Sequence, residues 1–210
     1  MTIDSPSRPT QLRRAITLEG ITVGYNAAEG VVAIVAGLAA GSVALTGFGV
    51  DSVIEVTSGA VVWWRLRAEL GSTALGRSAE ARAARWAGIL LLALGAYIVL
   101  ESGRRLLTQD RPAESAVGIV LTALSLVVMP LLARAKLRLA NALQSRALRA
   151  DTHETFICAW LALTTLIGLG LNAVFGWWWA DPVAALAMVP LIVREGLEAA
   201  GARHPADLET

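Results

Sequence analysis

The sequence predicts an all-α integral membrane protein with six transmembrane helices and both termini in the cytoplasm. Of its 210 residues, 55% are hydrophobic, and the mean hydropathy of +0.58 is high for a soluble domain. The apolar residues come in blocks of about 20, the length that a helix needs to cross the hydrocarbon core of a bilayer. These blocks make membrane lipid the expected surrounding of the protein. A formal net charge of +1 offers no basis for nucleic-acid binding.

Six apolar blocks define the predicted spans. They cover residues 17–40, 42–65, 83–106, 113–133, 147–175 and 182–200. The fourth and fifth spans are expected to extend beyond the membrane, because the basic stretch between them still favours helix. We expect this stretch, residues 134–149, to be a solvated helical hairpin that touches lipid headgroups.

Three segments follow from these blocks. Residues 1–14 are expected to form a disordered cytoplasmic tail, residues 15–201 the six-helix domain, and residues 202–210 a second cytoplasmic tail. The polar start has no apolar segment of the kind that a signal peptide contains. The single cysteine, Cys158, excludes an internal disulfide.

The basic residues predict the orientation. With both termini inside, 15 of the 18 lysines and arginines fall on the inner side, and three fall outside. The inner residues are Arg8, Arg13, Arg14, Arg65, Arg67, Arg77, Arg82, Arg85, Arg134, Lys136, Arg138, Arg146, Arg149, Arg194 and Arg203. Cytoplasmic loops carry such an excess, so we expect an integral protein of the bacterial inner (cell) membrane.

Two acids interrupt the second span. Asp51 and Glu55 are four residues apart, which on a helix places them on one face and one turn apart. A carboxylate at this depth costs several kcal/mol unless something pairs with it. The pair therefore predicts a cation site.

The fifth span offers a second pair at the same spacing. Glu154 and Cys158 share a helix face, and Asp151 lies one turn earlier on nearly the same face. His153 is rotated by about 100° from Glu154 and is not expected to be a ligand. Asp51, Glu55, Glu154 and Cys158 together would give three oxygens and one sulfur, which suit Zn²⁺ or Cd²⁺. A cysteine that is simply a small buried hydrophobic residue remains an equal alternative.

Four further polar positions have local interpretations. Asn26 and Glu29 in the first span, like Asp151 in the fifth, are secondary ligand candidates, although Asn26 is more simply explained by a hydrogen bond to a neighbouring helix. Glu101 is expected to pair with the arginines three and four residues later. Asp181, which precedes a proline, is expected to cap the sixth span.

These motifs resemble those of the cation diffusion facilitator (cation efflux) family. The resemblance rests on Asn26, on Gly41-Ser42-Val43-Ala44-Leu45, on the pair Asp51 and Glu55, on Glu101-Ser102, on Ala150-Asp151 and on Ala180-Asp181-Pro182. In the fifth span, Glu154 stands where the family has His, and Cys158 where it has Asp. The chain resembles short forms that lack the C-terminal cytoplasmic domain.

The resemblance implies a divalent cation transporter, with Zn²⁺ as the first candidate ion, coupled to protons in an antiport that exports metal from the cytoplasm. It also implies a homodimer, no resident cofactor and no enzymatic activity. Apposed carboxylates would hold protons when the site is empty, which would allow exchange without a histidine. The alternative is a non-transporting membrane protein with the same fold, acting as a metal-binding partner or sensor.

Overall fold

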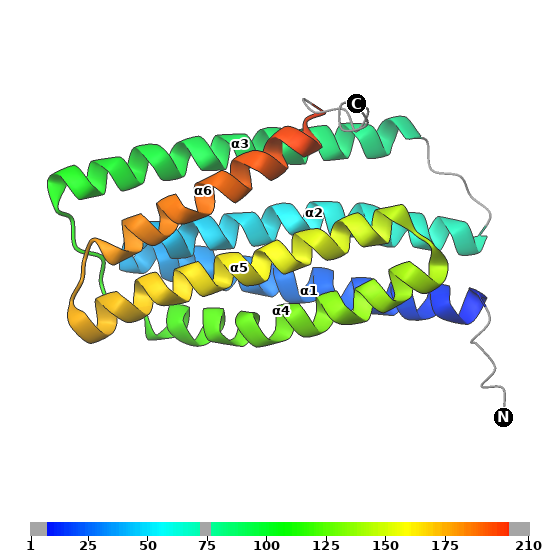
Figure 1. Cartoon of the computed structure of the whole chain (residues 1–210), viewed down its shortest axis with the longest axis horizontal. Helices are drawn as coiled ribbons and strands as arrows, with labels where there is room; N and C mark the ends of the chain where they lie inside the picture. Colours follow the sequence, from blue (N-terminus) through cyan, green and yellow to red (C-terminus); the bar gives the residue numbers. More distant parts are fainter. Residues whose placement is uncertain (1–7, 72–76, 202–210) are drawn as a thin grey trace, which may run out of the picture.

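Six long helices run along a common axis in the computed structural model, which describes residues 8–71 and 77–201 (Figure 1). They are α1 (Arg8–Ala40), α2 (Val43–Gly71), α3 (Arg77–Thr108), α4 (Ala116–Leu143), α5 (Arg146–Phe175) and α6 (Ala180–Ala199). No strand occurs in the described ranges. The predicted all-α fold with six helices is confirmed.

The outer surface is apolar, as a lipid-facing surface must be. Four helices, α1, α2, α4 and α5, are long and apolar enough to cross a membrane. Large apolar side chains point away from the protein on several helices, with Leu107 of α3 87% exposed and Val174 of α5 73% exposed. Water would oppose this exposure, whereas lipid chains accept it.

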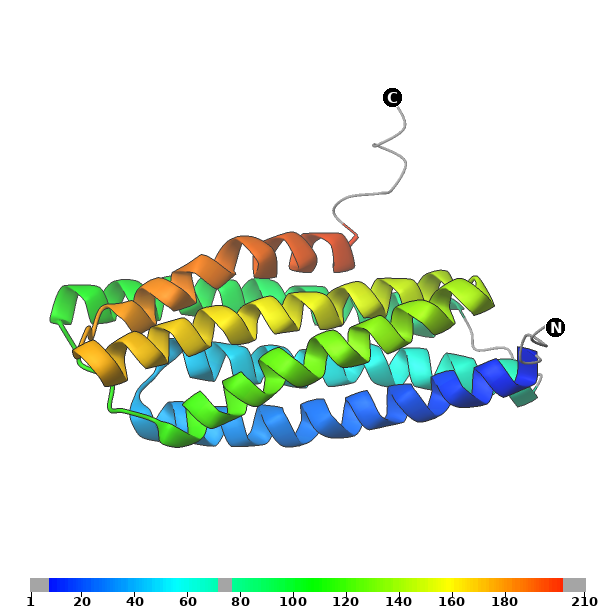
Figure 2. The same ribbon diagram turned by 60° about the horizontal axis from the view of Figure 1, so that its bottom comes forward.

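The helices form a four-helix bundle with a helix pair on one side. The bundle contains α1, α2, α4 and α5, and the pair formed by α3 and α6 packs against α2 and α5 (Figure 2). The α1–α2 connection turns sharply at Gly41, whose φ of +64° favours glycine. The α4–α5 connection is also short, since α5 begins at Arg146, three residues after α4 ends, and Ser145 caps it by accepting a hydrogen bond from the Leu148 N–H.

The first helix begins earlier than the sequence predicts. Residues 8–14 belong to α1, so the predicted tail was wrong for this part, whereas residues 1–7 and the predicted tail at 202–210 lie outside the described residues. Leu12 and Ala15 are buried in a cluster with α2, α4 and α5. An ion pair of 2.6 Å between Arg8 Nη2 and Glu69 Oε1 adds a surface contact. Burial of one apolar stripe therefore extends the helix.

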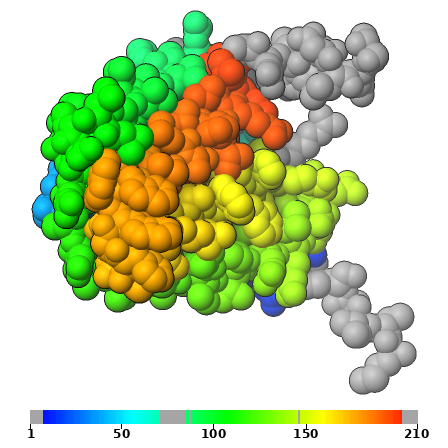
Figure 3. Space-filling view, turned by 60° about the vertical axis from the view of Figure 1, so that its left-hand side comes forward, coloured from blue at the N-terminus to red at the C-terminus, as the bar shows by residue number. Residues whose placement is uncertain are grey.

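We call the end of the molecule that holds the α1–α2, α3–α4 and α5–α6 connections the loop end, and the opposite end the termini end. Figure 3 looks onto the loop end, where the end of α5 and the start of α6 lie against each other. Glu101 pairs there with Arg104 at 2.7 Å and with Arg105 at 2.9 Å, so the predicted pairing is confirmed.

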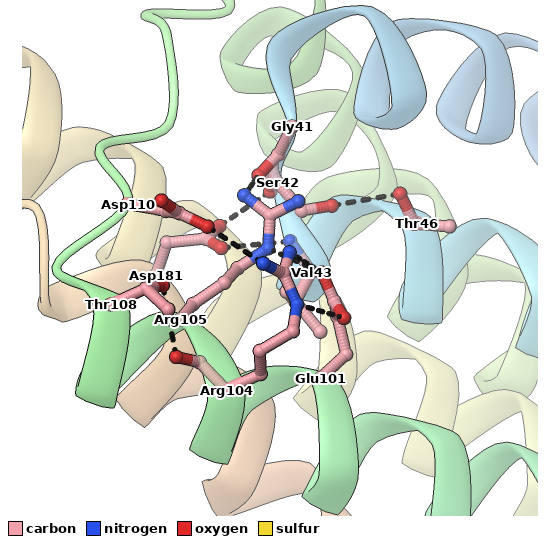
Figure 4. Close-up of polar contacts among 10 residues, drawn as sticks. All are labelled: Gly41, Ser42, Val43, Thr46, Glu101, Arg104, Arg105, Thr108, Asp110 and Asp181. Atoms are coloured by element: carbon pink, nitrogen blue, oxygen red, sulfur yellow. Dashed lines mark hydrogen bonds and ion pairs between the residues drawn. The ribbon is translucent and has the colours of Figure 1, made fainter.

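Asp181 does not cap its own helix. It lies inside the first turn of α6, and its carboxylate accepts hydrogen bonds from the Ser42 hydroxyl and, at 2.8 Å, from the Val43 N–H at the start of α2 (Figure 4). The Arg105 guanidinium donates to the Gly41 carbonyl beside it. The predicted cap of α6 was wrong because the free N–H groups at the start of α2 lie within reach of the same carboxylate. These contacts tie α2, α3 and α6 together at the loop end.

Candidate cation site

The two acids of α2 lie inside the protein. Asp51 is 7% exposed and Glu55 is 8% exposed. Neither carboxylate oxygen of Glu55 makes a hydrogen bond of good geometry to the residues that the structure describes, although the Thr155 hydroxyl and the Cys158 thiol lie beside it. A buried acid without a partner is unfavourable, so this carboxylate needs a proton or a cation.

A pocket of about 90 Å³ brings Asp51, Glu55 and Glu154 together. A cavity of about 10–15 Å³ is enough to hold one water molecule. The pocket therefore has room for a cation with part of its hydration shell. The Ser58 hydroxyl, one turn after Glu55 on the helix, donates to Glu154 Oε2 at 2.5 Å and holds that side chain at the pocket. Asp51 and Glu55 of α2 and Glu154 of α5 thus share one pocket, whereas Cys158, the second member of the α5 pair, does not line it.

A fourth carboxylate lines the same pocket. Glu195 of α6 lies close enough to Asp51, Glu55 and Glu154 to repel their charges. Glu195 was not predicted as a ligand from the sequence, because Arg194 beside it is typical of a surface ion pair. The signal in the sequence was an acid inside an otherwise apolar span, as at Asp51.

Cys158 is close to this pocket without lining it. It is 1% exposed and lies beside Glu55, one turn further along α5 than Glu154. The residues that line the pocket are Asp51, Ile54, Glu55, Ser58, Leu91, Glu154, Glu195 and Ala199. The thiol therefore lies next to Glu55 but outside the set of side chains that line the pocket.

The two secondary candidates on α1, Asn26 and Glu29, are also buried, and Glu29 lies near the pair of α2. Glu29 accepts a hydrogen bond of 3.2 Å from the Ser52 hydroxyl, and its charge acts on both Glu55 and Asp51. Glu29 Oε1 and Asn26 Oδ1 have no hydrogen-bond partner within the described part of the chain. Both oxygens remain available to a ligand or to water.

Asp151 belongs to a different cluster. Its carboxylate lies 2.5 Å from Lys136 Nζ, which also contacts Glu19 at 3.1 Å. Lys136 is 1% exposed and Glu19 is fully buried, so the solvated character expected for residues 134–149 was wrong at this position. The periodicity of α4 turns Lys136 toward α1 and α5, where two acids compensate its charge. Sequence signals existed, since Lys136 is the only lysine of the chain and Glu19 stands in an apolar run.

The ligand candidates stand apart in this conformation. In residues 8–71 and 77–201, no three His, Cys, Asp or Glu side chains are close enough to hold one metal ion. His153 lines a separate, open pocket with Arg149 and Phe156, away from the acids. The pocket therefore presents carboxylates to a common space, and closer coordination requires the helices to move or water to bridge.

The fold and the pocket define a helical membrane protein that keeps several carboxylates buried between α2, α5 and α6. Residues 21–200 match the family model described as the cation efflux transmembrane domain. The chain belongs to this cation efflux family.

Similarity to a curated protein agrees with the family. A protein of Synechocystis sp. (strain ATCC 27184 / PCC 6803 / Kazusa), described as an uncharacterized transporter, is 31% identical over 159 residues. The aligned region covers 70% of this chain and 49% of the relative. The chain thus spans about half the length of the relative that it matches.

Proposed function

We propose that this protein carries divalent metal cations across the membrane and exchanges them for protons, exporting metal from the cytoplasm. The observation that supports this most is the pocket shared by Asp51, Glu55 and Glu154, in which Glu55 has no hydrogen-bond partner among the described residues. Ionisable groups inside a membrane protein are costly and usually mark an ion pathway. Membership of the cation efflux family points to the same activity.

The proposed ligands are Asp51, Glu55, Glu154 and Cys158, with Asn26 and Glu29 as additional oxygen donors. A set of carboxylates with one thiolate suits Zn²⁺ or Cd²⁺. Asp151 is left out of this set, since Lys136 already neutralises it. Metal ligands bind in the deprotonated form, so binding would release the protons that the empty acids hold. This exchange couples metal and protons through the same side chains.

We infer a transporter rather than an enzyme, because most polar side chains that line the pocket are carboxylates, which are suited to binding cations. We also propose that the protein is a homodimer in the bacterial inner membrane, as the family resemblance implies.

Uptake of Zn²⁺ and Cd²⁺ into proteoliposomes under an imposed pH gradient tests the proposal. We expect uptake to follow the gradient, and Asp51→Asn to reduce it at least about tenfold, the scale of losing a partner at a metal site. Glu198→Gln is a matched control, because Glu198 is exposed and pairs with Arg194. Uptake that ignores the gradient would remove the proton coupling, and normal uptake by Asp51→Asn would remove the site.

A non-transporting metal-binding protein is the second candidate. It is favoured by the altered fifth span, in which Glu154 and Cys158 stand at positions where the family has His and Asp. Equilibrium binding of Zn²⁺ to the purified protein, without flux into proteoliposomes in either direction of the gradient, would support this candidate over transport.

A further inference from the structure

Glu195 enters the acid pocket from outside the four-helix bundle. Asp51 and Glu55 come from α2 and Glu154 from α5, whereas Glu195 comes from α6, which packs with α3 as a separate pair. Its side chain is partly exposed, while Asp51 and Glu55 are buried. Glu195 therefore lies at the outer part of the pocket, on the side of the helix pair.

Close contact between α3 and α6 fixes this position. A Cβ atom added to Gly196 would lie 2.9 Å from Leu92 Cγ, and one added to Gly88 would lie 2.4 Å from the Ala200 nitrogen. Both glycines thus allow the two backbones to touch. Because Gly196 adjoins Glu195, the last turns of α6 cannot shift along α3 without a clash, and the carboxylate stays at the pocket.

The neighbouring arginine does not neutralise Glu195. Arg194 Nε lies 2.9 Å from Glu198 Oε1, and both side chains are exposed. The described residues that line the pocket include four carboxylates and no basic side chain. Among them, Glu55 is 8% exposed, and both of its carboxylate oxygens lack a hydrogen-bond partner among the described residues. The pocket is thus built for a positive ligand.

We propose that Glu195 is a cation ligand of this site and makes its accessible part an all-oxygen site for a divalent cation. This inference rests on the proposed function and names an additional binding residue. Because Cys158 lies behind the pocket, a cation first meets the oxygens of Asp51, Glu55, Glu154 and Glu195. Oxygen-only sites suit ions such as Mn²⁺, whereas a thiolate favours Cd²⁺. Glu195 would therefore contribute more to binding of Mn²⁺ than to binding of Cd²⁺.

Equilibrium titration of the full chain in detergent with Mn²⁺ alone and with Cd²⁺ alone tests this inference. We expect Glu195→Gln to weaken Mn²⁺ binding by about 10- to 100-fold, the cost of removing one group at a metal site. Cd²⁺ binding should weaken less, because Cys158 remains. Glu198→Gln, three residues further on the same helix, should leave both affinities unchanged. Circular dichroism and gel filtration establish that each variant is folded.

Two results would overturn the role of Glu195. One is Mn²⁺ affinity in Glu195→Gln equal to that of Glu198→Gln, and the other is an equal loss of Mn²⁺ and Cd²⁺ affinity. Asp51→Asn separates this failure from failure of the proposed function. If Asp51→Asn loses binding while Glu195→Gln does not, only the role of Glu195 is wrong. If neither variant loses binding, the proposed site is wrong as well.

Discussion

Two buried charge clusters lie side by side in this protein, and they differ in where their positive charge comes from. In the first, which we call the lysine cluster, Lys136 of α4 sits between Glu19 of α1 and Asp151 of α5. The second is the acid pocket, in which the described lining residues supply carboxylates but no basic group. The lysine cluster carries its own cation, whereas the acid pocket has none among its described lining residues and only feels the charge of Lys136 from the neighbouring cluster.

Thr155 marks the boundary between the two clusters. The distance from Lys136 Nζ to the hydroxyl oxygen of Thr155 is 3.4 Å, and the Thr155 side chain also lies beside Glu55. Gly59, one turn after Glu55 on α2, covers the lysine cluster, since a Cβ there would approach Glu19 Oε1 to 3.0 Å. The Lys136 ammonium and the acid pocket are thus only about one helical turn apart.

The largest expected effect comes from removing the resident cation. Lys136→Met leaves Glu19 and Asp151 buried without compensation, and breaking one side of a buried ion pair costs about 3–5 kcal/mol. We expect this loss in the free energy of unfolding, measured by denaturant titration in mixed micelles.

A triple variant sharpens this test. Adding Glu19→Gln and Asp151→Asn to Lys136→Met removes the uncompensated charges, so most of the lost stability should return. If the triple variant were no more stable than Lys136→Met alone, charge compensation would not be what Lys136 contributes.

The second effect concerns the pocket and has a smaller magnitude. A cation that binds the folded state stabilises it by about 2.7 kcal/mol at 100 times its Kd. We therefore expect Zn²⁺ or Mn²⁺ to raise the unfolding midpoint of the wild-type protein and of Glu198→Gln. The same ions should have no such effect on Asp51→Asn, and an equal rise in all three proteins would argue against binding in the pocket.

The third effect is the smallest and has the opposite sign from the first. Glu55→Met replaces an unpartnered buried carboxylate by an apolar side chain of similar length, so the cation-free protein should gain about 1 kcal/mol, the low end of the penalty for an unsatisfied buried group. Thermal unfolding in the presence of a chelator measures this gain. A destabilised Glu55→Met protein would mean that Glu55 has a stabilising partner, and the contrast between the clusters would then be lost.

The sequence predicted the helices better than the partners of their charges. The apolar blocks located all six helices, although in the part of the chain that the structure describes only α1, α2, α4 and α5 are long and apolar enough to cross a membrane. The spacing of four residues placed Asp51 and Glu55 in one pocket with Glu154, but Cys158 does not line that pocket. Such patterns depend only on helix geometry along one chain segment.

Lys136 and Glu195 show what this reasoning could not reach. Each is close in sequence to arginines, which suggests a charged surface, yet Lys136 is buried and Glu195 faces the acid pocket. Which face of a helix is covered depends on the neighbouring helices, and this is decided by packing between distant segments. The start of α1 at Arg8 could not be predicted for the same reason, because its first turns are held by contacts with residues beyond position 60.

The hydrogen bonds between Asp181 and the start of α2 provide a point about which α6 can rotate. At the loop end, α6 is pinned to α2 through Ser42 and Val43. Glu195 lies 14 positions further along α6, about 21 Å away at 1.5 Å per residue. Because α6 is held against α3 at Gly88 and Gly196, the two helices would tilt as a pair, and a tilt of about 5° around this pivot would move Glu195 by about 2 Å relative to α2 and α5. A small rotation at the loop end is thus enough to carry a carboxylate into or out of bonding distance at the pocket.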